Sequence, residues 1–150
     1  MSAYRRILLA IDLTEESRQV AASAIAIAAA FDAELHAIHV IEPLSLAYGG
    51  DIPMDLSSVQ EQIHEQARSH LAEFANGLGV PAERQYLVFG RPESEIHRIA
   101  ETREMDLIIV GSHGRHGLAL LLGSTANAVL HGASCDVLAV RVGAGKQARD

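Results

Sequence analysis

The chain has 150 residues and carries 12 Lys plus Arg against 19 Asp plus Glu, which gives a formal net charge of −7. This length predicts a single domain, residues 1–150, and a hydrophobic content of 49% is enough for one sizeable core. An acidic chain without a basic block is a poor candidate for binding nucleic acid or anionic membranes. The only lysine, Lys146, lies in the tail, so nucleotide enzymes that grip phosphate with a P-loop lysine are excluded.

No part of the sequence is typical of a membrane span or a secretory leader. The apolar run Ile7–Ile11 is short and stops at Asp12, and no long apolar segment follows Arg5 and Arg6. Cys135 is the only cysteine, so neither a disulfide framework nor a cysteine metal site is expected. The predicted location is the cytoplasm, without insertion into a membrane.

The first predicted elements are a buried strand over Ile7–Ile11 and a helix behind it. Thr14 is a candidate N-cap, and Glu15 and Glu16 stand where the dipole of a helix N-terminus favours carboxylates. The helix carries apolar residues on one stripe at 3.6-residue spacing: Val20, Ala24, Ile27, Ala28 and Phe31.

A second strand is predicted over Leu35–Ile41. The irregular segment Pro43–Ser57 follows, and its length makes it a candidate mobile lid or partner-contacting loop. A long helix comes next, with Gly79 as its stop signal. One face of this helix is apolar: Val59, Ile63, Ala67, Leu71, Phe74 and Leu78.

Three more strands alternate with two helices in the second half of the chain. The strands are predicted over Tyr86–Phe89, Leu107–Val110 and Val137–Val142. Pro92 opens one helix, with acidic residues in its first turn, and Ser124–His131 forms the other. The first of these helices is expected to bury Ile96, Ile99 and Ala100. Residues 143–150 are expected to be a frayed, flexible tail.

Strands that are apolar on both faces and alternate with helices predict an α/β fold, with an open five-stranded parallel sheet covered by helices on both faces. Periodicity leaves the strand orders 2-1-3-4-5 and 3-2-1-4-5 both open. In either order, ligands bind at the carboxyl ends of the strands where the winding reverses. With order 3-2-1-4-5, Asp12 and Gly111, which are predicted to end strands one and four, face each other across one crevice.

The most informative stretch follows the predicted fourth strand. Gly111 and Gly114 form a glycine turn, and after a loop Gly123 is followed by Ser124 and Thr125 at a helix start. Glycines let backbone N–H groups approach an anion, and a helix N-terminus adds free N–H donors and a positive dipole end. The order strand, glycines, loop, glycine, hydroxyls and helix favours an anion cradle. A tight turn with plain helix capping is the structural alternative.

These residues resemble the universal stress protein family over essentially the whole chain. The matching motifs are Arg6-Ile-Leu-Leu-Ala-Ile-Asp12 with Ser17, His39-Val40, Gly90-Arg91-Pro92-Glu93, Asp106 to Gly114, and Cys135-Asp-Val-Leu-Ala-Val140. The resemblance implies sheet order 3-2-1-4-5. It also implies a module that binds ATP, with Mg²⁺, in the stress response and acts through ligand-dependent partner interaction.

The resemblance implies a role for each matching residue. Asp12 corresponds to the acidic residue near the nucleoside, and Val40 to the position whose backbone meets the adenine. Val110 and Gly111 correspond to the floor of the ribose and phosphate site. The nucleotide site implied in this way comprises Ala10, Ile11, Asp12, Val40, Val110, Gly111, Ser112, His113, Gly114, Arg115, Gly123, Ser124 and Thr125.

The glycine loop departs from the family pattern in one respect. ATP-binding members carry nine residues between the second glycine and the Gly-Ser or Gly-Thr pair, whereas eight residues separate Gly114 from Gly123 here, with Gly117 among them. This spacing leaves a second hypothesis open, in which the loop is structural and the protein is a nucleotide-independent dimeric interaction protein. In that case Val137–Val142 is an exposed sheet edge, which the family often pairs across a dimer dyad.

Catalytic groups are not evident, so the protein is not expected to be an enzyme, although slow ATP hydrolysis or self-phosphorylation stays possible. The site offers amide donors but neither an obvious base nor a lysine for a phosphoryl transition state. His36 and His39 are three residues apart on a strand, point to opposite faces and cannot share a metal. His113 and His116 flank the glycine loop and are candidate phosphate contacts or ordinary loop residues.

Overall fold

A computed structural model describes residues 3–43, 57–113 and 124–142. Three sequence predictions therefore lie outside the described residues: the lid or partner loop, the tail over 143–150, and the glycine loop with Gly114, Arg115 and Gly123.

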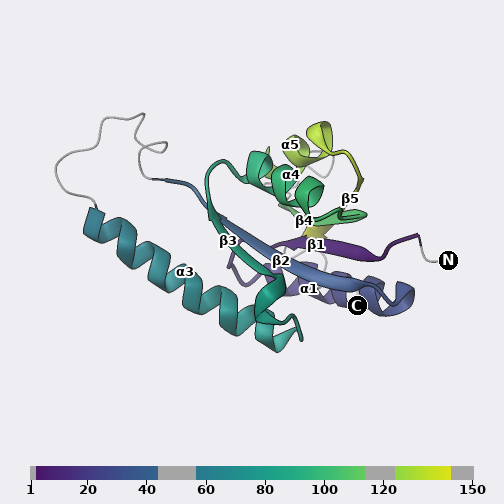
Figure 1. Cartoon of the computed structure of the whole chain (residues 1–150), viewed down its shortest axis with the longest axis horizontal. Coiled ribbons are helices and arrows are strands. Elements are labelled where there is room, and N and C mark those ends of the chain that lie inside the picture. Colours follow the sequence, from purple (N-terminus) through teal and green to yellow (C-terminus); the bar gives the residue numbers. More distant parts are fainter. Residues whose placement is uncertain (1–2, 44–56, 114–123, 143–150) are drawn as a thin grey trace.

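The sheet consists of five parallel strands in the order β3-β2-β1-β4-β5 (Figure 1). The strands span Arg6–Ala10 (β1), Glu34–Ile41 (β2), Gln85–Phe89 (β3), Leu107–His113 (β4) and Asp136–Val142 (β5). This order decides between the two that periodicity left open and confirms the one implied by the family resemblance. The winding reverses between β1 and β4, which are neighbours in the sheet.

Helices cover both faces of the sheet (Figure 1). The helices are α1 (Ser17–Phe31), α3 (Ser57–Gly77), α4 (Pro92–Thr102) and α5 (Ser124–Gly132), with a short 3-10 helix η1 at Ala82–Arg84. Because successive residues of a strand face opposite sides of the sheet, β1 contributes side chains to two cores. Ile7 and Leu9 pack with α1 and α3, whereas Leu8 packs with α4 and α5, and all three side chains are fully buried.

Helix α1 begins later than the predicted cap at Thr14. Its first residue is Ser17, and Glu15 and Glu16 precede the helix instead of lying in its first turn. The cause is local: the Asp12 carboxylate accepts hydrogen bonds from both the amide and the hydroxyl of Thr14. These bonds, together with Leu13 at φ +62°, fold the segment into turns before the helix can start.

Helix α3 packs on the sheet mainly through its second half. Ala67, Leu71 and Ala75 are buried, whereas Val59 and Ile63 on the same predicted face are 42% and 37% exposed. Figure 1 shows that the first half of α3 extends beyond the sheet. The helix ends near the predicted stop, where Gly79 adopts φ +80°.

Strand β4 is longer than predicted and corrects the expected turn at Gly111. Gly111, Ser112 and His113 continue the strand and pair with Val140, Arg141 and Val142 of β5. The reason is that β5 is long enough to offer backbone partners three residues beyond Val110. Gly111 is therefore a strand residue and not part of a turn.

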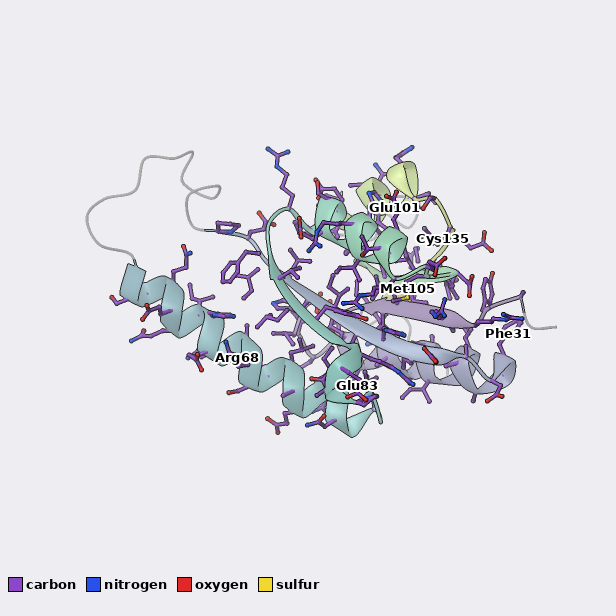
Figure 2. All side chains as sticks on the ribbon, viewed as in Figure 1. Phe31, Arg68, Glu83, Glu101, Met105 and Cys135 are labelled. Atoms are coloured by element: carbon purple, nitrogen blue, oxygen red, sulfur yellow. The ribbon has the colours of Figure 1, made fainter. Side chains whose placement is uncertain are left out.

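Figure 2 shows Phe31, Met105 and Cys135 toward the amino-terminal ends of the strands. Cys135 contacts the core that α4 and α5 form, as expected for a packing residue. Burial raises the pKa of its thiol above the usual range, and Asp136 and Asp106 add to that shift. A protonated thiol is a poor nucleophile, which agrees with a packing role. Within the described residues, no helix is long and apolar enough to cross a bilayer.

Candidate functional site

A cavity of about 260 Å³ opens at the carboxyl ends of the strands, where the winding reverses between β1 and β4. This is the place where open parallel sheets hold their ligands. Its lining combines both sides of the sheet: Ala10, Ile11, Asp12, Ser17, Val20, Ile38, His39, Val40, Glu42, Pro92, Ile96, Val110, Gly111 and Thr125.

The cavity brings together many of the residues predicted for the nucleotide site. Seven of them line it: Ala10, Ile11, Asp12, Val40, Val110, Gly111 and Thr125. Two described residues do not line it: Ser112 is buried, and Ser124 is exposed at the first position of α5. His113 ends β4, and its side chain lies outside the described part of the structure.

Asp12 organises the entry into α1. Its Oδ1 accepts hydrogen bonds from the Thr14 amide at 3.0 Å, the Thr14 hydroxyl at 2.7 Å and the Ser17 hydroxyl at 2.5 Å. The Asp12 amide in turn donates to Ser17 Oγ at 3.3 Å. Asp12 thus ties the segment before α1 to the first residue of the helix. This role is compatible with ligand binding, because Asp12 is exposed and also lines the cavity.

Ile11 joins the end of β1 to β2 through both of its backbone groups. Its amide donates to the carbonyl oxygen of Ile38 at 2.8 Å, and its carbonyl oxygen lies 2.6 Å from Nδ1 of His39. His39 projects from the face of the sheet opposite to His36, as the strand period predicts. His36 instead contacts Tyr86 and Glu34.

The start of α5 supplies the cavity with donors for an anion. Thr125 lies in the first turn of this helix, where the amide groups have no partner within the helix and the dipole is positive. Its hydroxyl is a further donor. A phosphate group at this end of the cavity meets the same chemistry that holds anions at other helix N-termini.

The cavity is acidic in its described part. Asp12 and Glu42 contribute carboxylates, and none of the described lining residues is a lysine or an arginine. The described residues also contain no cluster of three or more His, Cys, Asp or Glu arranged to hold a metal ion. Mg²⁺ usually binds proteins through one or two carboxylates and takes its other ligands from phosphate and water. Asp12 and Glu42 fit a cation that arrives with a nucleotide.

The site residues predicted from the sequence left out half of the residues that line the cavity: Ser17, Val20, Ile38, His39, Glu42, Pro92 and Ile96. Ser17 and His39 belonged to the family motifs but carried no assigned role. A signal for Glu42 existed, because it directly follows a strand whose carboxyl end reaches the crevice. Val20 and Ile96 could be predicted as core residues of helices, but not as residues whose outer atoms form a cavity wall.

A larger groove, of about 600 Å³, lies between α1 and α3. It shares the α1 entry loop with the crevice, since Leu13 and Thr14 line the groove while Asp12 and Ser17 line the crevice. The groove lies along two helices and away from the strand ends, so the sheet topology does not mark it as a ligand site.

The fold and this crevice define a class of protein. Comparison with known proteins identifies the family. The family model described as the universal stress protein family matches residues 3–141. The chain belongs to this family.

Among curated relatives, universal stress protein A homolog 1 of Coxiella burnetii is 44% identical over 138 residues, which cover 91% of this chain and 96% of the relative. Among solved structures, universal stress protein UspA from Lactobacillus plantarum shares the fold at a TM-score of 0.72 and 22% identity, covering 92% of this chain and 98% of that one. A universal stress protein in complex with cAMP matches at a TM-score of 0.59 and 26% identity, covering 93% and 98%.

Proposed function

We propose that this protein is a nucleotide-binding module of the stress response, which binds ATP in the crevice between β1 and β4 and changes its interaction with a partner when the ligand is bound. The observation that carries the proposal is the meeting of Asp12 with Thr125 in one cavity at the switch point of the sheet. A member of the family that was crystallised with cAMP adds support from a relative.

In this proposal the phosphates are held without a lysine. The amide groups and hydroxyl at the start of α5 face the cavity through Thr125, and the glycine loop with Gly114, Arg115 and Gly123 follows β4 in the sequence. The carboxylates of Asp12 and Glu42 repel a bare polyphosphate, so bound Mg²⁺ compensates part of the charge. The nucleoside then occupies the part of the cavity lined by Ala10, Val40 and Val110.

We further propose that binding, and not turnover, is the activity. The described lining offers two carboxylates but no lysine or arginine for the charge of a transferred phosphoryl group. Slow hydrolysis or self-phosphorylation is a measurable alternative, detected as phosphate release or as an added mass of one phosphate. One domain over residues 1–150 and a cytoplasmic location complete the proposal.

A thermal unfolding experiment with Mg-ATP tests the proposal. Ligand at about 100 times its Kd stabilises the native state by about 2.7 kcal/mol, so the unfolding midpoint rises with ATP concentration. Thr125→Val removes the hydroxyl at the α5 start and reduces the shift, whereas Thr102→Val, at the end of α4 and outside the cavity, leaves it unchanged. Gly123→Val is expected to abolish the shift. No shift at millimolar Mg-ATP contradicts nucleotide binding.

A second candidate function is dimerisation through β5, independent of nucleotide. It is favoured by the position of β5 at an edge of the sheet and by Leu138, which is 36% exposed on that strand. Open strand edges offer unpaired backbone groups and are commonly paired or protected. We propose a homodimer through Val137–Val142, which is compatible with nucleotide binding in each protomer.

A further inference from the structure

We propose that His39 determines ligand specificity in the crevice, where its Nε2 accepts a hydrogen bond from a hydroxyl or amino group of the bound nucleoside. The inference rests on the proposed nucleotide function and assigns a direct ligand contact to a side chain whose visible role is to hold the backbone. Its basis is the hydrogen bond that His39 makes on the other side of its ring.

The contact with Ile11 settles which ring nitrogen carries the proton. Nδ1 of His39 lies 2.6 Å from the carbonyl oxygen of Ile11. A carbonyl oxygen can only accept, so Nδ1 must donate and therefore carries the hydrogen. In a neutral imidazole the other nitrogen, Nε2, is then an acceptor with a free lone pair. Ile11 thus fixes His39 in one tautomer.

Nε2 is available to a ligand. Within the described part of the chain it makes no hydrogen bond, yet no buried side-chain nitrogen or oxygen lacks a partner there. Because His39 is only half-buried, Nε2 must reach solvent, and the residue lines the crevice. The ring that carries this oriented acceptor lines the cavity, and its opposite edge is anchored to the carbonyl group of Ile11.

The chemistry of Nε2 explains what it recognises. In the neutral ring Nε2 can only accept, so its partner on the ligand must carry a hydrogen. Such an acceptor selects the donor-bearing part of a nucleotide: ribose hydroxyls or an exocyclic amine. The phosphate part belongs at the α5 start, where the donors lie.

Two substitutions separate the anchoring edge from the recognising edge. His39→Asn keeps an amide nitrogen near the position of Nδ1 and loses Nε2, so Ile11 keeps its partner and the ligand loses one. His39→Gln places its amide near the position of Nε2 and loses the anchor. Isothermal titration with Mg-ATP gives the affinity of each variant, and thermal unfolding of the unliganded protein gives its stability.

The expected result is a crossed pattern. His39→Asn weakens ATP binding about fivefold, as loss of one hydrogen bond predicts, and keeps the unfolding midpoint of the wild type. His39→Gln binds ATP more tightly than His39→Ala but unfolds at a lower temperature than the wild type. If His39→Asn does not fold, the comparison of the glutamine and alanine variants decides the question.

Nucleotide analogues identify the donor. If Nε2 accepts from the ribose, the wild type prefers ATP over 2′-deoxy-ATP or 3′-deoxy-ATP by a similar factor, and His39→Asn loses that preference. If Nε2 accepts from the amine of the base, the wild type prefers ATP over inosine triphosphate, and His39→Asn loses that preference. Folded variants that bind ATP and all analogues as the wild type does overturn the role of His39 alone. A wild type that binds none of these nucleotides overturns the proposed function, and this inference with it.

Discussion

At the scale of single residues, His36 is a buried titratable group outside the crevice, with a partner on each ring nitrogen. It is 7% exposed, its Nε2 lies 3.2 Å from Glu34, and its Nδ1 lies 3.0 Å from the Tyr86 hydroxyl. Glu34, as a carboxylate, accepts from Nε2–H, so Nδ1 accepts from Tyr86. Burial lowers the pKa of His36 below its ordinary value, and Arg84 and Arg6 also lower it, against the opposing hydrogen bond and charge of Glu34.

This arrangement predicts that stability falls as the pH falls. A histidine whose pKa is lowered in the folded state binds its proton more readily when unfolded, so the unfolding free energy declines as the pH drops below about 6.5 and through the lowered pKa. Urea unfolding at about pH 7.5 and about pH 5.5 measures the decline. Phenylalanine cannot titrate, so His36→Phe shows a smaller decline of the unfolding free energy between these pH values. The variant is nevertheless less stable than the wild type at both.

The pH range isolates His36 from its partner. The pKa of Glu34 is lowered from 4.5, mainly by its hydrogen bond to His36, so Glu34 titrates below the range measured. His131→Phe, at an exposed position on α5, is the control and keeps the wild-type decline. An equal decline in wild type and His36→Phe contradicts the role of His36.

The placement of a residue could be predicted from the sequence where it follows from the position at which an element ends. Asp12 follows a buried strand and Thr125 opens a helix, and the parallel topology alone brings such positions together. The link between His39 and Ile11 could not be predicted in this way. It joins residues 28 positions apart and depends on the direction of one carbonyl group, which no periodic pattern encodes.

At the scale of elements, α4 and α5 are joined by a side chain that caps a helix. Nε2 of His97, on α4, donates to the carbonyl oxygen of Val129 at 2.7 Å. Val129 lies in the last turn of α5, where carbonyl groups have no partner within the helix. Gly132 leaves the room for this contact, because a Cβ at that position would lie 2.4 Å from the His97 ring.

Gly132→Ala is therefore predicted to destabilise the protein by about 1–3 kcal/mol, the usual cost of overpacking. The ring of His97 must move and lose its bond to Val129. Chemical denaturation measures the change. Gly77→Ala is the matched control, because a Cβ there meets nothing within 4 Å, and its effect is expected to be small. In a His97→Ala background, Gly132→Ala should cost less stability than in the wild type. If it costs as much, a clash with the His97 ring is not the cause.

Element types were predictable because each strand is apolar on both faces and each helix has one apolar stripe. Element ends were less predictable, because they depend on contacts between distant segments. Gly111 signals a turn on its own, yet β5 extends far enough to keep it in the sheet. Thr14 looks like a cap, yet Asp12 draws its amide into an earlier turn. Val59 and Ile63 continue an apolar face that the sheet is too narrow to cover.

At the scale of the whole molecule, the proposed dimer is tested by the solution mass. Wild type is expected near twice the 16.1 kDa of one chain in light scattering after size-exclusion chromatography. Leu138→Lys places a charge on the exposed side of the edge strand and shifts the mass toward one chain. Leu130→Lys, at a leucine 48% exposed on α5, keeps the dimer. A monomeric wild type refutes the dimer.

The central position of β1 has a consequence for how the molecule opens. This strand pairs with β2 on one side and β4 on the other, and its side chains belong to both cores. Neither helical layer can separate fully without exposing one face of β1. Its amide hydrogens should therefore exchange with solvent only through global unfolding, whereas those of β3 and β5 at the sheet edges exchange through smaller local openings. The floor of the crevice thus belongs to the slowest-exchanging part of the chain, while its walls come from faster ones.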